Sequence, residues 1–344
     1  MTYTIVSEYP KIDLKSWSTF VSDHPDGNIF QKPEMYQLLK ATHKFEPIIL
    51  IVYDNKENIC GLIVAVVQRE FENILGFFTT RTIIWGGPLI DCDDTREKAK
   101  LVDLLLKSLI RRVNNKSIYI QFRNLFDLSD FFPQFRLNGF AYHDHLNFIV
   151  NTSEEKGVRS RISKSKITQI NKSLENGAKI IEPNKVQDVI SFYKILKTLY
   201  KTKVKKPLPS RSFFVKFYEK TKLESIGVYL LIQYQGKIIG GTMCPITRDK
   251  AIYELYICGL DKKFKGIYPS VLATWAPIEY ALNNGLKFFD FMGAGSPDEQ
   301  YGVRKFKARF GGELVNYGRF ERVNHKSLYK LGKLGINLLN IFFL

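Results

Sequence analysis

The sequence predicts an α/β (α+β) protein made of two similar domains, each with a mixed sheet flanked by helices. Three observations support this prediction. The chain has 344 residues, a usual length for two domains, and 45% of them are hydrophobic, which is enough for two cores. Strand-like and helix-like segments follow one another in the same order in both halves. Short matching residue groups stand at corresponding places in the two halves.

In the first half, apolar runs at 46–53 and 59–67 flank Asp54-Asn55-Lys56, a turn sequence typical of a hairpin. A third strand is expected at 81–90. The 3.6-residue spacing of apolar residues predicts a helix over 96–113, and a further strand is expected at 117–122. The order is therefore strand, strand, strand, helix, strand.

The second half repeats this order. Strands are expected at 227–234, 238–245 and 251–258, followed by a helix over 269–282 and a strand at 287–291. The spacing from Asn114-Asn115 to Gln121-Phe122 equals the spacing from Asn283-Asn284 to Asp290-Phe291. This order is the core of the acetyltransferase (GNAT) fold, so the chain is predicted to be a tandem of two GNAT-like acyl-N-acyltransferase domains.

The predicted domains are 1–152 and 153–325, with the main ligand groove on the second, and an apolar tail follows at 326–344. A basic helix is expected between the two repeats, at 163–174, ending at Asn176-Gly177. This segment belongs to the second domain in our division.

The positive charge is unevenly distributed. The net charge is +17, and residues 156–222 alone carry eighteen Lys or Arg against four Asp or Glu, a local +14. Such a field attracts a polyanion or a phosphate-bearing substrate. A tRNA, a nucleotide sugar and an anionic membrane face all fit this field, as does a basic surface that only keeps the protein soluble.

The cysteines and the termini indicate a cytoplasmic protein. No pair among the four cysteines (Cys60, Cys92, Cys244 and Cys258) has Cys-x-x-Cys spacing, so we expect buried thiols in a reducing compartment. The N-terminus lacks a secretion signal, and no apolar run reaches the roughly 18–20 residues that span a bilayer. The apolar tail from Leu328 to Leu344 either contacts the inner membrane face peripherally or caps the second core.

The most informative stretch is 288–320. An apolar strand opens into the small-residue loop Gly293-Ala294-Gly295-Ser296-Pro297, and a cationic segment follows at 304–310. Gly293 and Gly295 let the backbone approach a ligand, and the cations could meet its negative charge. The alternative is a strand end, a turn and a solvated basic face.

Four motifs in this region carry a family resemblance: FDFMG at 289–293, GVRKFK at 302–307, FGG at 310–312 and YG at 317–318. They resemble the C-terminal signature of the Fem family, the aminoacyltransferases that build peptidoglycan cross-bridges and share a twin GNAT-like fold with the wider FemAB group. NIFQ at 28–31, WGGP at 85–88 and QFRN at 121–124 agree in order, so the resemblance covers roughly 25–325.

The resemblance implies an active-centre lysine in the GVRKFK motif. By position this role falls to Lys305, with Lys307 as the rival. A strand would align Lys305, Lys307 and Arg309 on one side, whereas a helix would pair Lys305 with Arg309. Lys307, Arg304, Gly293 and Gly295 are expected to contribute to substrate binding.

The resemblance also implies an acceptor site. Arg211 resembles the family's arginine that contacts the acceptor's phosphate, although the usual tyrosine four residues on is Val215 here. Tyr256 resembles a tyrosine of the strand that lines the acceptor groove, and Lys40 resembles a lysine at the groove mouth. For Tyr256 the alternative is half-buried packing in the sheet.

No cofactor is expected, because the family takes its acyl group from aminoacyl-tRNA. In acetyltransferases a Gly-rich turn holds the pyrophosphate of coenzyme A, but here only Lys263-x-x-Gly266 survives, with Tyr268 where a small residue is wanted. The equivalent positions 91–94 of the first half are acidic and would repel a pyrophosphate.

Other candidates are weaker. His143 and His145 have no third ligand in sight, so no metal site is expected. Asp290 is either a base or a loop cap, and the loop carboxylates Asp298 and Glu299 could accept the proton of an amine.

The sequence therefore favours a Fem-like acyltransferase that forms an amide on a phosphate-bearing cell-envelope precursor. The donor would be aminoacyl-tRNA and the acceptor a peptidoglycan stem-peptide amine. One alternative uses acyl-coenzyme A to acylate an amino sugar of a surface polysaccharide. The other is a non-catalytic RNA- or membrane-binding protein built on a decayed transferase fold.

Overall fold

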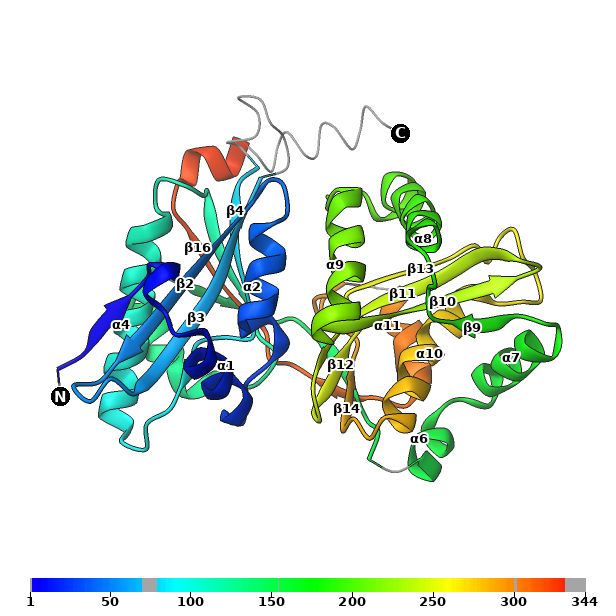
Figure 1. Ribbon diagram of the computed structural model, residues 1–344, viewed down its shortest axis with the longest axis horizontal. Helices are drawn as coiled ribbons and strands as arrows, with labels where there is room; N and C mark the ends of the chain where they lie inside the picture. The colour runs from blue at the N-terminus through cyan, green and yellow to red at the C-terminus, as the bar shows by residue number, and fades with distance from the viewer. Residues whose placement is uncertain (1, 70–78, 154, 300–301, 332–344) are drawn as a thin grey trace. The chain divides into compact units, whose positions relative to one another are not determined.

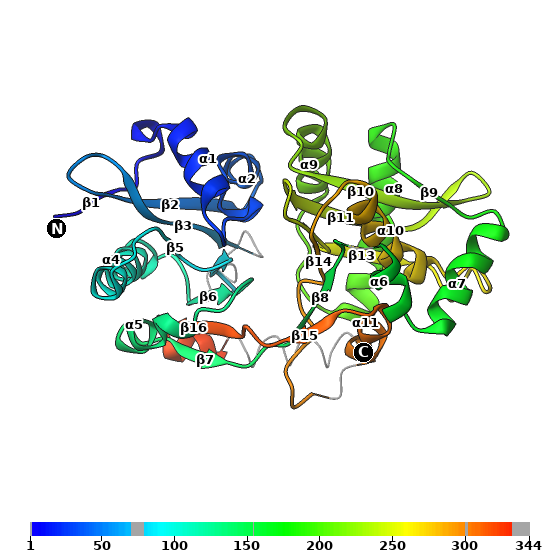
Figure 2. The same ribbon diagram turned by 90° about the horizontal axis from the view of Figure 1, so that it is seen from below.

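The computed structural model describes residues 2–69, 79–153, 155–299 and 302–331, and the chain forms two compact units. The first unit combines the residues up to Asp144 with those from Tyr317 on, and the second is His145–Asn316. Each unit contains one mixed sheet with helices against it (Figures 1 and 2). The predicted fold class is confirmed.

The sheet of the first unit contains eight strands, and β5 pairs with β3 beside the main path. In order across the sheet they are β1 (Thr4–Val6), β2 (Phe45–Tyr53), β3 (Ile59–Gln68), β4 (Arg81–Trp85), β6 (Tyr119–Arg123), β16 (Arg319–Val323) and β7 (Ala141–His143), with β5 at Leu89–Ile90. The described α-helices of this unit include α1 (Leu14–Asp23), α2 (Pro33–Lys40), α4 (Thr95–Val113) and α5 (Phe132–Leu137).

Both faces of this sheet are buried, because β2 and β3 are apolar at almost every position. Ile48 and Leu50 pack in one core with Leu105 of α4. Ile49 lies on the opposite face, in a second core with Trp17 of α1. Figure 2 shows α1 and α2 on one side of the sheet and α4 and α5 on the other. Continuous apolar runs rather than alternating ones are typical of strands covered on both faces.

The second unit has the same kind of sheet, in which β13 pairs with β11 beside the main path. In order the strands are β15 (Glu313–Val315), β8 (Asn147–Asn151), β14 (Phe288–Asp290), β12 (Ala251–Tyr253), β11 (Lys237–Thr247), β10 (Gly227–Tyr234) and β9 (Lys179–Ile181), with β13 at Tyr256–Gly259. The helices are α6 (Glu155–Arg161), α7 (Lys164–Glu175), α8 (Val186–Leu199), the π-helix η4 (Tyr200–Val204), α9 (Arg211–Glu224), α10 (Pro269–Asn283), α11 (Gly302–Lys307) and the 3₁₀ turn η5 (Ala308–Phe310).

Side chains alternate across β10 and fill two cores in this unit. Val228 and Leu230 pack with α10 residues such as Trp275. Tyr229 points to the other face, where its hydroxyl donates to the Phe214 carbonyl of α9 at 2.8 Å. A strand places successive side chains on opposite faces, so α10 and the α8–α9 pair cover opposite faces of this sheet.

The internal repeat is visible in the third strand of each unit, which was predicted as one strand and is divided into two. The first piece, β4 or β12, pairs in parallel with the strand after the long helix, β6 or β14. Among the described residues, the second piece, β5 or β13, pairs only with the strand before it. In both units the third strand and the strand after the long helix therefore stop pairing where the second piece begins.

The unit boundaries differ from the predicted 1–152 and 153–325. Residues 147–151 form β8 of the second sheet, and residues 319–323 form β16 of the first, between β6 and β7. Two strands thus lie outside the division that chain order suggests. Residues 326–331 are helical, and most of the predicted tail lies outside the described residues.

Candidate active site

The second sheet opens at the end of β12. β12 and β14 pair in parallel from Ala251 opposite Phe288 to Tyr253 opposite Asp290. Beyond this point β13 pairs with β11 and with no other strand that the structure describes. The chain after β14 turns into the loop that begins at Phe291. Glu254 follows β12 directly, so it stands where the two strands separate.

Asp290 and Asn147 hold the start of this loop. The Asn147 side-chain amide donates to Asp290 Oδ1 at 2.7 Å, and the Met292 backbone N–H donates to the same oxygen at 2.6 Å. The Gly293 N–H donates to Asn147 Oδ1 at 2.7 Å. Met292 and Gly293 have φ angles of 59° and 127°, which explains why glycine is needed at 293. Asp290 is therefore a loop cap, one of the two roles expected for it.

Lys307 completes this buried group. Its Nζ donates to the carbonyls of Phe291 at 2.7 Å and Gly293 at 3.0 Å, and it lies 3.3 Å from Glu254 Oε1. Lys307 is 9% exposed and Glu254 5% exposed. We call these five residues the Glu254 cluster: Asn147, Glu254, Asp290, Gly293 and Lys307.

Burial changes the proton affinity of both carboxyl groups. Loss of solvent raises the pKa of Glu254 to about 7, although the nearby Lys307 ammonium opposes this rise. Desolvation also raises the pKa of Asp290, against the hydrogen bonds from Asn147 and Met292. Clusters of perturbed groups are typical of active centres. The Glu254 cluster is therefore the candidate active site.

The segment after the loop is helical, which separates the two lysines. In α11 a step of two residues turns a side chain to another side of the helix, so Lys305 is exposed whereas Lys307 points into the core. Arg304 is hydrogen-bonded to the loop: its guanidinium donates to the carbonyls of Ala294 at 2.9 Å, Pro297 at 3.1 Å and Ser296. Of the residues predicted around the loop, the structure brings Lys307, Arg304 and Gly293 together.

Gly295 lies in the same loop, and its carbonyl accepts from the Leu146 N–H at 2.9 Å. Glu254 and Asn147 were not among the residues predicted from the sequence. Glu254 had a detectable signal, because it is the single charged residue in the apolar run 251–258. Asn147 had none, since its role depends on the pairing of β8 with β14.

Tyr256 and Arg211 lie on neighbouring elements of the second unit. Tyr256 is half-buried on β13, with its ring 5.1 Å from that of Phe214 on α9. Arg211 is the exposed first residue of α9. The π-helix η4 adds Tyr200, whose ring lies 6.3 Å from Tyr256, and π-helical turns are frequent at functional sites. Lys40 belongs to the first unit, where it is exposed at the end of α2.

The start of α10 corresponds to the turn that binds pyrophosphate in acetyltransferases. Here Asp261 Oδ1 accepts from the Ser270 N–H at 3.1 Å, and Asp261 Oδ2 accepts from the Ser270 hydroxyl. Pro269 has no N–H, and the amides of Val271 and Leu272 bond to the Tyr268 carbonyl. Within the described chain these amides are used internally and a carboxylate stands beside them, so the residues present do not fit the pyrophosphate of coenzyme A.

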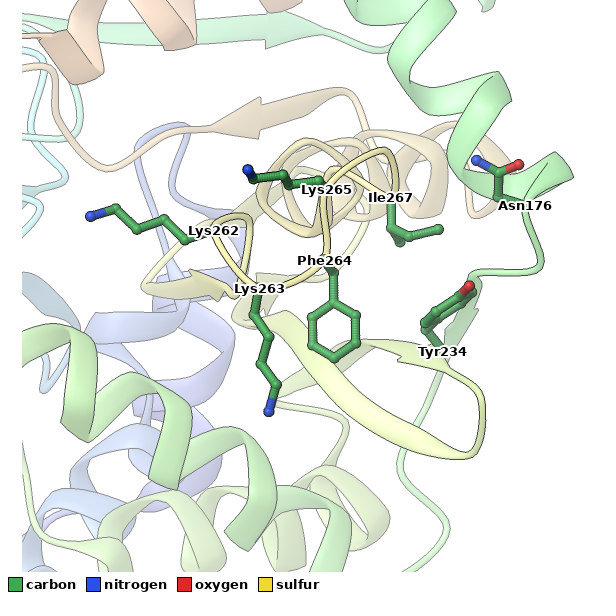
Figure 3. Close-up of a pocket in the computed structure, with 7 residues that line it drawn as sticks. All are labelled: Asn176, Tyr234, Lys262, Lys263, Phe264, Lys265 and Ile267. Carbon is green, nitrogen blue, oxygen red and sulfur yellow. The ribbon is translucent and has the colours of Figure 1, made fainter.

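A pocket of about 530 Å³ lies beside the same turn (Figure 3). It is lined by Asn176, Tyr234, Lys262, Lys263, Phe264, Lys265 and Ile267. The rings of Tyr234 and Phe264 meet edge to face at 6.0 Å, and the three lysine side chains spread outward from the turn. The pocket therefore offers aromatic surface surrounded by positive charge.

The described residues contain no group of three His, Cys, Asp or Glu side chains that could hold a metal ion. They also contain no helix that is long and apolar enough to span a membrane.

The four cysteines are free, with Cys244 and Cys258 buried and Cys60 and Cys92 half-buried. Burial raises the pKa of the Cys60 thiol.

The divided third strand, present in both sheets, is the shared feature of a tandem GNAT-like fold, and the Glu254 cluster lies where this strand divides in the second sheet. Residues 234–335 match the FemAB family, so the resemblance to the Fem family that the motifs predicted is confirmed. No curated protein sequence matches this chain.

Solved structures agree on the fold. FemX is 14% identical with a TM-score of 0.70, over 96% of this chain and 99% of FemX. A tandem GNAT protein from the clavulanic acid biosynthesis pathway is 9% identical with a TM-score of 0.59, over 94% of this chain and 99% of that protein. L-PGS from Bacillus licheniformis is 13% identical with a TM-score of 0.55, over 95% and 96% of the two chains.

Proposed function

We propose that this protein is a Fem-like acyltransferase that forms an amide on a cell-envelope precursor. Its donor is aminoacyl-tRNA, and its acceptor is the amine of a peptidoglycan stem peptide. One observation carries the proposal: the stretch that matches the FemAB family contains Glu254, Asp290, Gly293 and Lys307, four of the five residues of the Glu254 cluster. The family match and the candidate active site therefore coincide.

The chemistry asks for positioning and charge stabilisation. When an amine attacks an ester carbonyl, negative charge develops on the carbonyl oxygen, and a positioned cation lowers the energy of that state. Lys305 and Lys307 are the two candidates for this role. A cation away from water interacts more strongly with a developing charge, so burial favours Lys307.

The donor is argued from two features of the second unit. Asp261 stands beside the amides at the start of α10, and its negative charge opposes the pyrophosphate of acyl-coenzyme A. The net +14 of residues 156–222 and the lysine-rimmed pocket suit the phosphates of an RNA chain instead. These features favour aminoacyl-tRNA over acyl-coenzyme A.

A direct assay tests the proposal. The protein is incubated with a mixture of aminoacyl-tRNAs and a nucleotide-linked stem-peptide precursor. The mass of the precursor is then measured by mass spectrometry. We expect the mass of one or more aminoacyl groups to be added. In parallel, thermal shift with tRNA, coenzyme A and UDP-sugars compares the ligands. Transfer only from acyl-coenzyme A to an amino sugar would contradict the proposal, as would binding of RNA without any transfer.

Arg211 provides a first mutational prediction. If the exposed guanidinium at the start of α9 contacts the acceptor's phosphate, Arg211→Ala removes one charge-assisted hydrogen bond. Binding of a phosphate-bearing acceptor is then expected to weaken by about 1.5–3 kcal/mol with the melting temperature unchanged. Calorimetric titration of wild type and variant measures the loss.

Lys222→Ala is the matched control, because it removes one exposed positive charge from the other end of the same helix. Its effect on acceptor binding is expected to be small. Equal affinities of wild type and Arg211→Ala for every phosphorylated acceptor would show that Arg211 is only surface charge.

A further inference from the structure

Glu254 is a buried carboxylate with one oxygen engaged and one not. Its side chain is 2% exposed, and Oε1 lies 3.3 Å from Lys307 Nζ. Oε2 is equally buried and accepts no hydrogen bond from any residue that the structure describes. Leaving such an atom without a partner costs free energy, so a buried oxygen of this kind requires an explanation.

The groups that face Glu254 come from three elements. Lys307 of α11 is the cation, Asp290 of β14 is a second carboxyl group, and the Cys244 thiol of β11 lies within electrostatic reach. Asp290 Oδ1 already accepts two hydrogen bonds, from Asn147 and Met292. Lys307 donates to two carbonyls as well as facing Glu254. Within the cluster, Glu254 Oε2 is the oxygen that is fully buried and has no hydrogen-bond partner among the described residues.

Amide formation needs such an acceptor. An amine of a peptide is mostly an ammonium ion at neutral pH, since its pKa is about 8 to 10, and an ammonium ion cannot attack a carbonyl. One proton must leave the nitrogen before the attack. The general base for this step works best when its own pKa lies near the working pH. A carboxyl group whose pKa burial raises to about 7 meets that condition.

We propose that Glu254 is the proton acceptor of the transfer step, with Lys307 as the partner that holds Oε1 and leaves Oε2 to receive the proton. The inference rests on the proposed function. The acceptor ammonium gives one proton to Glu254 Oε2, and the free amine attacks the donor's ester carbonyl. The C–N bond forms, the ester C–O bond breaks, and the second proton of the nitrogen leaves with the departing oxygen as a hydroxyl group. Deprotonation of Glu254 to solvent closes the cycle.

The test is the pH dependence of turnover in Glu254→Gln, which keeps the shape of the side chain and removes its proton affinity. Wild-type kcat/KM is expected to rise with pH through about 7, because Glu254 must be ionised to act. In the variant, kcat is expected to fall about 100- to 10,000-fold, with little change in KM. The rise of the pH–rate profile near pH 7, which we call the limb, is expected to disappear. Folding is checked by circular dichroism and by the melting temperature.

Two variants serve as controls. Glu279→Gln changes a half-buried glutamate of α10 that accepts from Trp275, and its profile is expected to match wild type. Lys307→Met keeps the apolar stem and removes the cation that favours the ionised form of Glu254. The limb is then expected to move to higher pH, a shift that a purely structural role of the pair would not produce.

The outcomes separate the two proposals. If wild type transfers no acyl group to any stem-peptide amine, the proposed function fails. If wild type is active and Glu254→Gln keeps both the rate and the limb, only the role of Glu254 fails. Titration of the Glu254 carboxyl carbon by ¹³C NMR needs no substrate, and an ordinary glutamate pKa there would overturn the inference by itself.

Discussion

Lys307→Ala is expected to cost the protein both turnover and stability. In the proposed reaction, negative charge on the acyl group loses a buried cation when the ammonium is removed, and loss of one such stabilising group typically lowers kcat by about two to three orders of magnitude. Glu254 is left as a buried charge without its cation, which typically costs about 3–5 kcal/mol of folding free energy. Steady-state kinetics and urea unfolding measure the two effects separately.

The loss of stability is expected to depend on pH. Burial already raises the pKa of Glu254 to about 7, and without Lys307 the pKa rises further. The folded variant then binds more protons than the unfolded chain between the ordinary glutamate pKa and the raised value, so stability falls as pH increases through this range. The deficit of Lys307→Ala relative to wild type should be larger at pH 8.5 than at pH 6.

Lys305→Ala is the matched control, two residues away in the same helix. Lys305 is exposed, so its removal should leave the unfolding free energy close to that of wild type. The sequence motif assigned the active-centre role to Lys305, and this assignment remains a prediction. If Lys305→Ala abolished turnover and Lys307→Ala did not, Lys305 would be the catalytic cation and Lys307 a structural one.

Phe320→Ala is expected to destabilise the first unit, although residue 320 is near the C-terminal end of the sequence. Phe320 is 2% exposed, and its ring stacks on that of Phe135 with centroids 3.9 Å apart. Truncation of a buried phenylalanine leaves a cavity and typically costs about 3–5 kcal/mol. Urea unfolding of the full chain, followed by tryptophan fluorescence, measures the loss: Trp17 and Trp85 report on the first unit, and Trp275 reports on the second.

Phe288→Ala is the control for this experiment, because Phe288 of β14 is 41% exposed and its truncation leaves no closed cavity. We expect its cost to be well below that of Phe320→Ala. If Phe320→Ala affected only the transition reported by Trp275, β16 would not belong to the first sheet.

Much of the fold could be predicted because it depends on local patterns. The apolar runs 46–53 and 59–67 became β2 and β3, and the helix expected at 269–282 is α10. Such runs specify a strand or a helix wherever they lie, since burial of an apolar side chain is favourable with any apolar partner. The division of the third strand was harder to see, because β12 and β13 differ mainly in which strand they pair with.

The candidate site was predicted in part. The loop at Gly293 and the cations after it were found from residue types, because glycines and clustered charges are visible one position at a time. The choice between Lys305 and Lys307 depended on whether 302–310 is a helix or a strand, and the six-residue α11 is too short for its periodicity to decide this. Glu254 and Asn147 lie 107 positions apart and meet in one cluster only because β8 and β12 both flank β14.

The sequence by itself determined the two-fold repeat of strands and helices, the basic character of 156–222 and the motifs of the C-terminal half. Only the tertiary structure decided which strands join which sheet, which lysine is buried and which carboxylate it meets. Local patterns specify elements because they need only a neighbour of the right polarity. A strand that joins a sheet far from it in the sequence needs one particular neighbour, as β16 needs β6. A buried charge likewise needs one particular partner, as Glu254 needs Lys307. That partner is selected by the free energy of the whole packed unit, in which an unpaired strand edge or an unpaired buried charge is costly.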